Sequence, residues 1–309
     1  MNLKYLGIIL KSKINKVIQK RYVYVPSDVK EIELSNYGDL FLTEYVNTVY
    51  INVNKTIGFD KEVLSLVIKR LLNQGKTVYI NEEIKMFTYD DYMDFLKISS
   101  NFFINERYIE KTNSLASNQI LTMTIHDYVQ MMKKLLYFTA KVEATVSDDL
   151  QKIILTILQI TQYIEYGEVA SNKESCVSKC LEHKKGVCID ISVTMYKCME
   201  LMGIECEVIK GIGGNDSKVN NALMYDHAWN QIKYDGNWYN LDITWFETSG
   251  VTAFLLASDK DFYIDTIHQT MFKVHKCDSS IPQVTVFEYI DKLKKIPNFF
   301  DEFDKKLKY

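Results

Sequence analysis

The chain lacks the features that mark several specialised classes of protein. Its 37 basic and 40 acidic side chains give a formal net charge of −3, so its electrostatic field does not indicate nucleic acid or a membrane surface as a partner. No apolar stretch approaches the roughly 18 residues of a membrane-spanning helix. The N-terminus also lacks the long apolar segment and small-residue cleavage site of a secretion signal. Hydrophobic residues make up 47% of the chain, which is ordinary for a folded globular protein. Since the sequence shows neither a secretion signal nor a membrane span, we expect a cytoplasmic protein.

Proline and cysteine are both sparse. The chain has three prolines, and no segment rich in proline, glycine or serine marks a domain boundary. None of its six cysteines lies in the first 175 residues, which excludes the dense disulfide framework of a small secreted domain. Cys176, Cys180, His183 and Cys188 can be read as a zinc-binding set, but their spacing is not that of a standard site. We therefore expect reduced thiols, no metal site and no cofactor.

The first part of the chain alternates between strand and helix patterns. Asp60 stands where a helix N-cap is expected, and Gly75 follows the end of the same helix. The alternation predicts an α/β module of unknown role over residues 1–115, built on a βαβ-like unit. No glycine-rich phosphate-binding loop occurs in it. The expected elements are a strand at 46–53, a helix at 60–74, a strand at 77–80, a helix at 89–98 and a short strand at 102–104.

Residues 116–280 have a different pattern and form the expected second domain. Ser147 is the predicted N-cap of a helix whose isoleucines recur at helical spacing. Gly203 is the predicted C-terminal stop of a later helix. Residues 281–309 are expected to form a helical tail. The predicted elements of the second domain are helices at 124–141, 147–165 and 189–202, strands at 206–210, 227–234 and 237–244, and a polar loop at 211–226 that is a candidate lid.

The dipeptide Asp235-Gly236 between two strand patterns is a strong hairpin signal, and it sets a register. With a two-residue turn, Tyr234 pairs with Asn237, and His227 comes opposite Thr244. Side chains alternate between the faces of a strand, so Asp242 is expected on the same face as His227. Such a diagonal pair is about 7–8 Å apart between α-carbons. That distance allows the carboxylate to bind the imidazole and to set its tautomer.

Cys188 follows Gly186 and Val187 at the predicted start of the 189–202 helix. A helix N-terminus carries partial positive charge and unpaired backbone N–H groups. The charge favours the thiolate, which is the reactive form of cysteine, and the N–H groups can stabilise an oxyanion. A nucleophile, a base and an orienting acid would then occur in the order Cys188, His227, Asp242.

These residues lie within motifs that resemble those of the transglutaminase-like family. Gly186–Ser192 reads GVCIDIS and is similar to the family's Gly-Val-Cys-x-Asp-x-Ala signature, with Ser192 in place of the usual alanine. His227–Asn230 reads HAWN, and Trp238–Trp245 reads WYNLDITW, similar to Trp-Tyr-x-x-Asp-x-Thr-Trp. Residues 202–211 and 254–259 also resemble family segments. The resemblance covers roughly residues 120–275.

The resemblance implies an α+β fold with a papain-like transglutaminase core. In this core a helix carrying the cysteine packs on an antiparallel sheet that carries the histidine and the aspartate. It also implies that Cys188, His227 and Asp242 are the catalytic triad of a cysteine peptidase or acyltransferase acting on a protein or peptide. Tyr166 can close a core or contribute to this site. The other histidines, His126, His268 and His275, have no acidic or thiol partner that the sequence indicates.

Two other functions remain open. The chain could be a catalytically idle transglutaminase-like scaffold that binds peptides or proteins. It could also be an amidase that removes glycans from glycoproteins, although no carbohydrate-binding module accompanies the motifs. The motifs do not distinguish hydrolysis by water from transfer to an amine.

Overall fold

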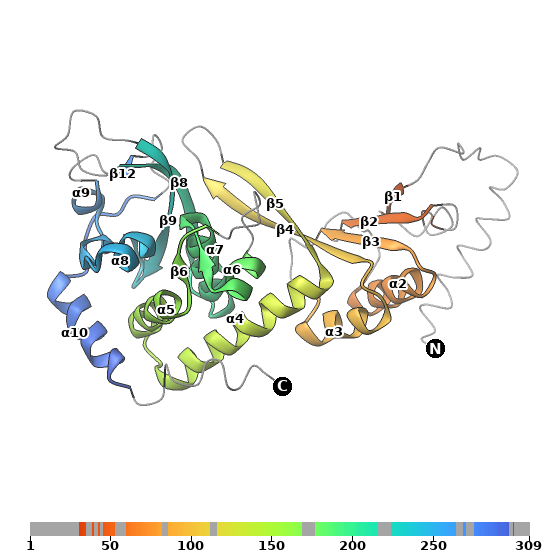
Figure 1. Cartoon of the computed structure of the whole chain (residues 1–309), viewed down its shortest axis with the longest axis horizontal. Helices are drawn as coiled ribbons and strands as arrows, with labels where there is room; N and C mark the ends of the chain where they lie inside the picture. Colours follow the sequence, from red (N-terminus) through yellow and green to blue (C-terminus); the bar gives the residue numbers. More distant parts are fainter. Residues whose placement is uncertain are drawn as a thin grey trace, which may run out of the picture. The chain divides into compact units, whose positions relative to one another are not determined.

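The computed structural model describes most of the chain (Figure 1). The described residues are 31–34, 39, 43, 46–52, 60–81, 86–111, 116–168, 177–214, 224–263, 268–269, 275–296 and 299. The chain divides into two compact units. Unit 1 is Met1–Tyr108 with Gln119–Gln130, and unit 2 is Ile109–Asn118 with Met131–Tyr309.

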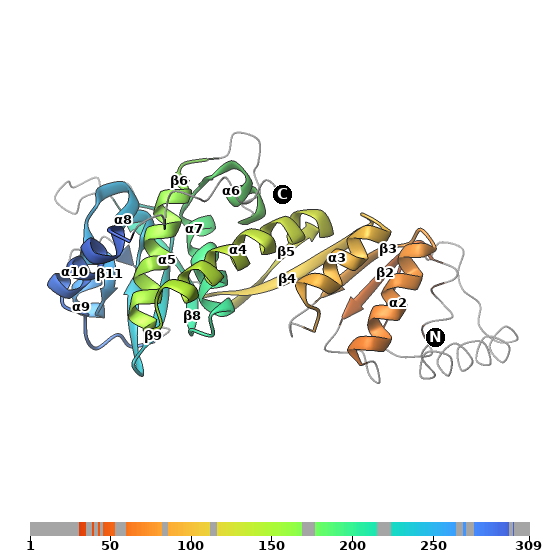
Figure 2. The same ribbon diagram turned by 90° about the horizontal axis from the view of Figure 1, so that it is seen from below.

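Unit 1 is built on parallel strands, which confirms the predicted βαβ alternation. Each of its first four strands pairs with the next in parallel. Figures 1 and 2 both show α2 and α3 on one face of this sheet. The strands are β1 (Glu31–Leu34), β2 (Thr48–Asn52), β3 (Thr77–Asn81) and the first part of β4 (Phe102–Lys111), and the helices are α2 (Lys61–Asn73) and α3 (Tyr89–Ile98).

Local signals place the helices of unit 1. The Asp60 carboxylate accepts the Val63 N–H and begins α2, as predicted. Thr88 and Asp91 form a reciprocal capping box at the start of α3. The strands alternate between two faces: residues such as Val49 and Val78 are fully buried. The alternate face carries a stacked row of aromatic rings whose centroids are 4.8 Å apart, formed by Tyr50, Tyr79 and Phe103.

The elements that follow have residues in both units or lead into unit 2. They are the second part of β4, then β5 (Ala116–Thr124), α4 (Ile125–Thr145) and α5 (Asp149–Tyr163). The predicted cap of α5 is wrong by one residue. Asp148, and not Ser147, is the N-cap, because its carboxylate accepts the Gln151 N–H at 3.0 Å.

Unit 2 contains an antiparallel sheet in the order β8-β9-β10-β11. A further short strand, β12, pairs with β8 through Gly213 and Ile212. The predicted loop over 211–226 is wrong at both ends, because 211–214 and 224–226 pair with each other as strand. The rest of that loop lies outside the described residues. The strands are β8 (Cys206–Gly214), β9 (Met224–Tyr234), β10 (Asn237–Leu241), β11 (Leu255–Ala257) and β12 (His268–Gln269).

Helix α7 (Cys188–Leu201) packs on strands β8 and β9, and α5 packs on α7. A separate parallel pair joins β6 (Glu165–Tyr166) to β7 (Lys185–Gly186), just before α7. The remaining elements are α6 (Val177–His183), α8 (Ile243–Ser249), the 3-10 turn η2 (Thr252–Phe254), α9 (Asp259–Phe262) and α10 (Gln283–Lys294). Helix α10 confirms the first part of the predicted helical tail, and residues 300–309 of that tail lie outside the described ones.

The chain is thus a mixed α and β protein, as expected. Within the part of the chain that the structure describes, none of the helices combines the length and the apolar character needed to cross a membrane.

Candidate active site

The predicted hairpin register is confirmed, but Asp242 is not part of the strand. Tyr234 pairs with Asn237, and the pairing continues as far as Leu241 with Asn230. At Asp242 the chain leaves the ladder, because its N–H donates to the Phe254 carbonyl at 2.9 Å. Asp242 is instead the N-cap of α8 and accepts the Trp245 N–H on Oδ1 at 3.0 Å. Thr244, the expected partner of His227, belongs to α8.

The structure nevertheless brings His227 and Asp242 into direct contact. Nε2 of His227 lies 2.6 Å from Oδ2 of Asp242, a distance typical of a strong, charge-assisted hydrogen bond. Both side chains are buried, with 2% and 0% of their surfaces exposed. Because Nε2 faces a carboxylate, we assign the ring proton of neutral His227 to Nε2. Nδ1 is then the nitrogen that can accept a proton from a thiol.

That thiol is Cys188, whose side chain is a hydrogen-bond partner of His227. It occupies the first position of α7, after the extended N-cap residue Val187. Asp190 stabilises this helix start by accepting the Val187 N–H at 3.0 Å, and its negative charge also suits the positive end of the helix dipole. The structure therefore gathers the three predicted site residues into one chain of contacts from thiol to imidazole to carboxylate.

Exposure distinguishes Cys188 from the other cysteines. Among the five cysteines that the structure describes, Cys188 is partly exposed and the rest are buried. Burial raises the pKa of Cys198 and of Cys277 to about 12, and it also raises the pKa of Cys206. These three therefore remain protonated thiols at neutral pH. Cys176 of the considered zinc set lies outside the described residues.

The pKa values of His227 and Asp242 are both shifted in the direction that favours their charged forms. Burial lowers the pKa of His227, but the hydrogen bond that His227 donates to Asp242, together with the interaction with Cys188, outweighs burial and raises the pKa to about 9. Burial acts to raise the pKa of Asp242, yet the hydrogen bonds from His227 and His268 lower it to about 2. At neutral pH the arrangement therefore favours an imidazolium beside an ionised carboxylate, which is the partner that a thiolate requires.

His268 is a part of the site that the sequence analysis missed. Its Nε2 lies 2.8 Å from Oδ2 of Asp242, the same oxygen that binds His227. The sequence did not indicate this acidic partner. No local pattern could have indicated this contact, because the two residues are 26 positions apart and β12 has two residues. His268 reaches Asp242 because β12 pairs with β8 at Gly213.

His227, Asp242 and His268 also form a group whose ligand atoms all lie within 4.8 Å of one another, close enough to hold a metal ion. Their spacing fits hydrogen bonds better. Ligands at about 2.0–2.2 Å from an ion in tetrahedral geometry are separated by more than about 3 Å. The two N–O distances of 2.6 and 2.8 Å are shorter than that. All three side chains are also buried. These distances are those of a buried hydrogen-bond network centred on Asp242.

Gly213 leaves room for the His227 ring. A Cβ atom at this position would lie 2.9 Å from Cβ, 3.0 Å from Cγ and 3.1 Å from Cδ2 of His227. Gly186 is similarly enclosed, since a Cβ there would lie 2.7 Å from Sγ of Cys180 and 2.9 Å from Cβ of Asp190. Glycine at these two positions thus leaves space for the His227 ring and for the start of α7.

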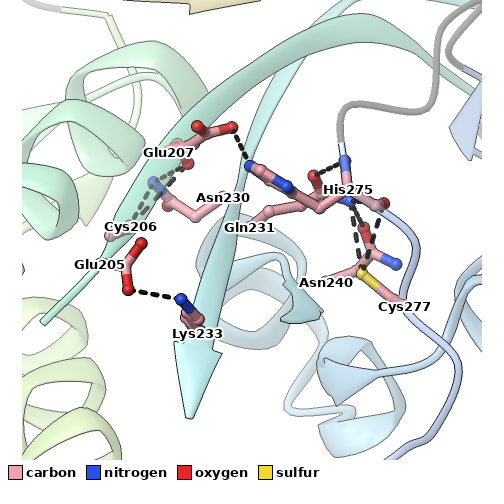
Figure 3. A network of polar contacts seen from close by, with 9 residues as sticks. All are labelled: Glu205, Cys206, Glu207, Asn230, Gln231, Lys233, Asn240, His275 and Cys277. Atoms are coloured by element: carbon pink, nitrogen blue, oxygen red, sulfur yellow. Dashed lines mark hydrogen bonds and ion pairs between the residues drawn. The ribbon is translucent and has the colours of Figure 1, made fainter. Parts of the chain in front are cut away.

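His275 belongs to a second polar network, shown in Figure 3. Its ring is stacked on Trp238 with centroids 3.7 Å apart, and its Nε2 lies 3.0 Å from a carboxylate oxygen of Glu207. The sequence did not indicate this acidic partner either. Gln231 joins the network by donating to the His275 carbonyl and by accepting its N–H. These contacts attach the segment that precedes α10 to the sheet of unit 2.

Three aromatic residues, Tyr166, Trp229 and Trp245, belong to the surroundings of the contact chain. Tyr166 pairs with Gly186, two residues before Cys188, and 40% of its surface is exposed. The Trp245 ring centroid is 5.7 Å from that of His227 and 4.3 Å from that of His268. Trp229 is fully buried behind both histidines. Tyr166 therefore occupies a solvent-facing position on the strand paired with the residues just before Cys188, whereas the rings of the two tryptophans lie beside the histidines.

Comparison with known proteins agrees with the predicted resemblance. Residues 137–243 match the model of the transglutaminase-like superfamily, a segment that contains Cys188, His227 and Asp242. No curated protein matches the chain. One similar solved structure is a protein from Cytophaga hutchinsonii assigned as a cysteine protease, with 20% identity and a TM-score of 0.28; the match covers 36% of this chain and 37% of that one. Another is described as a TGase, with 13% identity and a TM-score of 0.31, covering 56% and 55%.

Proposed function

We propose that the transglutaminase-like segment of this chain catalyses thiol-dependent acyl transfer or amide hydrolysis on a protein or peptide, with Cys188 as nucleophile, His227 as base and Asp242 as the orienting acid. The observation that carries the proposal is the contact chain itself. A partly exposed thiol contacts a buried imidazole, whose opposite nitrogen lies 2.6 Å from a buried carboxylate. Groups that act as nucleophile, base and orienter need this connection.

The first half of the reaction forms a thioester. The Cys188 thiolate attacks the amide carbonyl carbon, and the electron pair of the C=O bond moves to oxygen. The backbone N–H groups in the first turn of α7 can donate to that oxyanion, since the first turn of a helix has no intrahelical acceptors for them. His227 then donates its Nδ1 proton to the amide nitrogen, so that the C–N bond breaks and a neutral amine leaves.

The second half of the reaction resolves the thioester. His227, now neutral, accepts a proton at Nδ1 from the incoming nucleophile, which attacks the thioester carbon and releases the Cys188 thiolate. Water as nucleophile gives a carboxylic acid and makes the protein a peptidase or amidase. A primary amine gives a new amide and makes it a transglutaminase. In both halves Asp242 stays ionised and stabilises the imidazolium, as its lowered pKa requires.

The proposal is tested by selective alkylation. At pH 6 iodoacetamide should modify Cys188 faster than Cys198 or Cys277, because a thiol with a pKa of about 12 has roughly one thiolate in a million at that pH. Mass spectrometry of tryptic peptides measures each rate. Cys188 labelled no faster than Cys277 would remove the main support for catalysis and leave the idle scaffold.

Activity is then tested with two readouts, incorporation of a fluorescent primary amine into a mixture of proteins and release of new N-termini from the same mixture. Cys188→Ala should abolish whichever readout the wild type gives. Cys277→Ala is the matched control, because it removes a thiol of the same unit that is buried away from His227. A reaction that persists in Cys188→Ala would contradict the assignment of the nucleophile.

A further inference from the structure

The carboxylate of Asp242 is held by three N–H donors, more than a base-orienting acid needs to contact its histidine. The Trp245 N–H occupies Oδ1 at 3.0 Å. Nε2 of His227 and Nε2 of His268 both lie against Oδ2, at 2.6 and 2.8 Å. Asp242 and His268 are both fully buried, with 0% of their side-chain surfaces exposed. A buried anion needs such donors, since burial without them is costly.

The strands that carry the two histidines, β9 and β12, both pair with β8. On one side of β8, Gly211 pairs with His227 of β9. In the short pairing with β12, Gly213 of the same strand is the partner of His268. The positions of the two rings relative to Asp242 are therefore set by the register of β8 with two different strands. This arrangement fixes both imidazoles on the same carboxylate oxygen.

The surroundings of His268 keep its ring neutral. Its centroid lies 4.2 Å from that of Phe262, 4.3 Å from that of Trp245 and 5.3 Å from that of Phe254. Burial lowers the pKa of His268, and the hydrogen bond to Asp242 only partly opposes this effect. A neutral imidazole has one N–H, and the contact with Asp242 requires it on Nε2. Its Nδ1 has no partner within full hydrogen-bond geometry among the described residues, although a weaker backbone interaction with Phe262 also opposes the lowering of the His268 pKa.

We infer that His268 is a positioning residue, whose Nε2–H keeps the Asp242 carboxylate ionised and aimed at Nε2 of His227. A neutral donor suits this role, because a second imidazolium would repel the one that forms on His227. The effect on catalysis rests on the proposed function, but the hydrogen bond does not. The alternative is that the His268 ring only fills the space between Phe262, Trp245 and Phe254.

Two substitutions separate these roles. His268→Gln keeps an N–H donor near the position of Nε2, whereas His268→Leu keeps apolar volume and removes the donor. Loss of one hydrogen bond to a charged group should raise the pKa of Asp242 by about 1–2 units in His268→Leu, and His268→Gln should remain close to wild type. His275→Leu is the control, because this histidine contacts Glu207 and not Asp242. Titration of the ¹³C-labelled carboxyl group, assigned with Asp242→Asn, measures the pKa.

The same variants are compared for the rate of Cys188 alkylation from pH 5 to 9. We expect about a tenfold slower rate in His268→Leu and near wild-type rates in His268→Gln and His275→Leu. An Asp242 pKa that is equal in the Leu and Gln variants would overturn the inference. If wild-type Cys188 reacts no faster than Cys277, the proposed function fails, but the carboxyl titration still decides the role of His268.

A measurement on the wild-type protein tests the inference even if His268→Leu does not fold. The ¹⁵N shifts of His268 at pH 7 should show a neutral ring with its proton on Nε2. A proton on Nδ1, with Nε2 bare, would leave no donor for Asp242 and would refute the inference.

Discussion

Gly213→Ala tests the geometry of the base without changing any reacting group. The added methyl group would lie 2.9 Å from Cβ, 3.0 Å from Cγ and 3.1 Å from Cδ2 of His227. Ordinary van der Waals contact begins at 3.4 Å, so the shortest distance falls short by 0.5 Å (3.4 minus 2.9). The ring cannot easily absorb this shift, because the ring centroids of Trp229, Trp245 and His268 lie 5.5 to 6.0 Å from the centroid of His227. His227 must move relative to Cys188 or to Asp242.

The size of the effect follows from that displacement. A misplacement of about 1 Å in an active site can cost roughly 10²-fold in rate, so about half that distance corresponds to roughly tenfold. Overpacking of this kind also costs about 1–3 kcal/mol of stability. We therefore expect Gly213→Ala to fold, to melt at a lower temperature than wild type, and to lose about tenfold in the rate of Cys188 alkylation and in turnover.

The assay compares Gly213→Ala with Gly203→Ala. Gly203 has a φ of 72° and nothing within 4 Å of a Cβ, so alanine there strains the end of α7 without contacting His227. Both variants should lose stability, and Gly213→Ala alone should lose reactivity. An alkylation rate within about twofold of wild type in Gly213→Ala would refute the argument that this glycine positions the base.

Three further predictions concern the same contact chain. Asp242→Asn should lower turnover by about 10²–10⁴-fold while the fold persists, and near wild-type turnover would remove Asp242 from the mechanism. The pKa of His227 is raised from 6.5 to about 9, so the interactions of its charged ring stabilise the fold fully below pH 6.5 and are lost as the pH rises through 9. The difference in unfolding free energy between wild type and His227→Gln, measured in urea, should therefore shrink between pH 6.5 and 9. A difference that stays constant over this range would contradict the prediction. Gly186→Ala should lower the free energy of unfolding by about 1–3 kcal/mol and slow the alkylation of Cys188, because the new Cβ would clash with Sγ of Cys180. An unchanged melting temperature would show that the start of α7 accommodates the added methyl group.

Signals that act over a few residues were read correctly from the sequence. The Asp235-Gly236 turn predicted the register of β9 with β10, and that register brought His227 and Asp242 to the same end of the hairpin. Asp60 predicted the start of α2. The position of Cys188 at the start of α7 followed from the boundary of the helical pattern. Each of these depends on backbone geometry that neighbouring residues determine.

Sequence-based prediction failed where one local pattern is compatible with two different backbone structures. Asp242 was expected to extend β10, but a strand residue and an N-cap both have extended backbone, and the Phe254 carbonyl takes the N–H that the ladder would need. The polar segment 211–226 was expected to be a loop, yet residues 211–214 pair with β9 as strand, and Gly213 leaves space there for His227.

The sequence by itself determined which residues could supply a nucleophile, a base and an acid, because those residue types stand in motifs with their own helix start and hairpin. The tertiary structure alone decided that His268 shares the Asp242 carboxylate and that His275 pairs with Glu207. The first contact spans 26 residues, and the Gln231–His275 contact of the second network spans 44. Over such separations, contact depends on which edge of β8 and which part of the sheet the returning chain meets, and no local preference of these residues encodes that path.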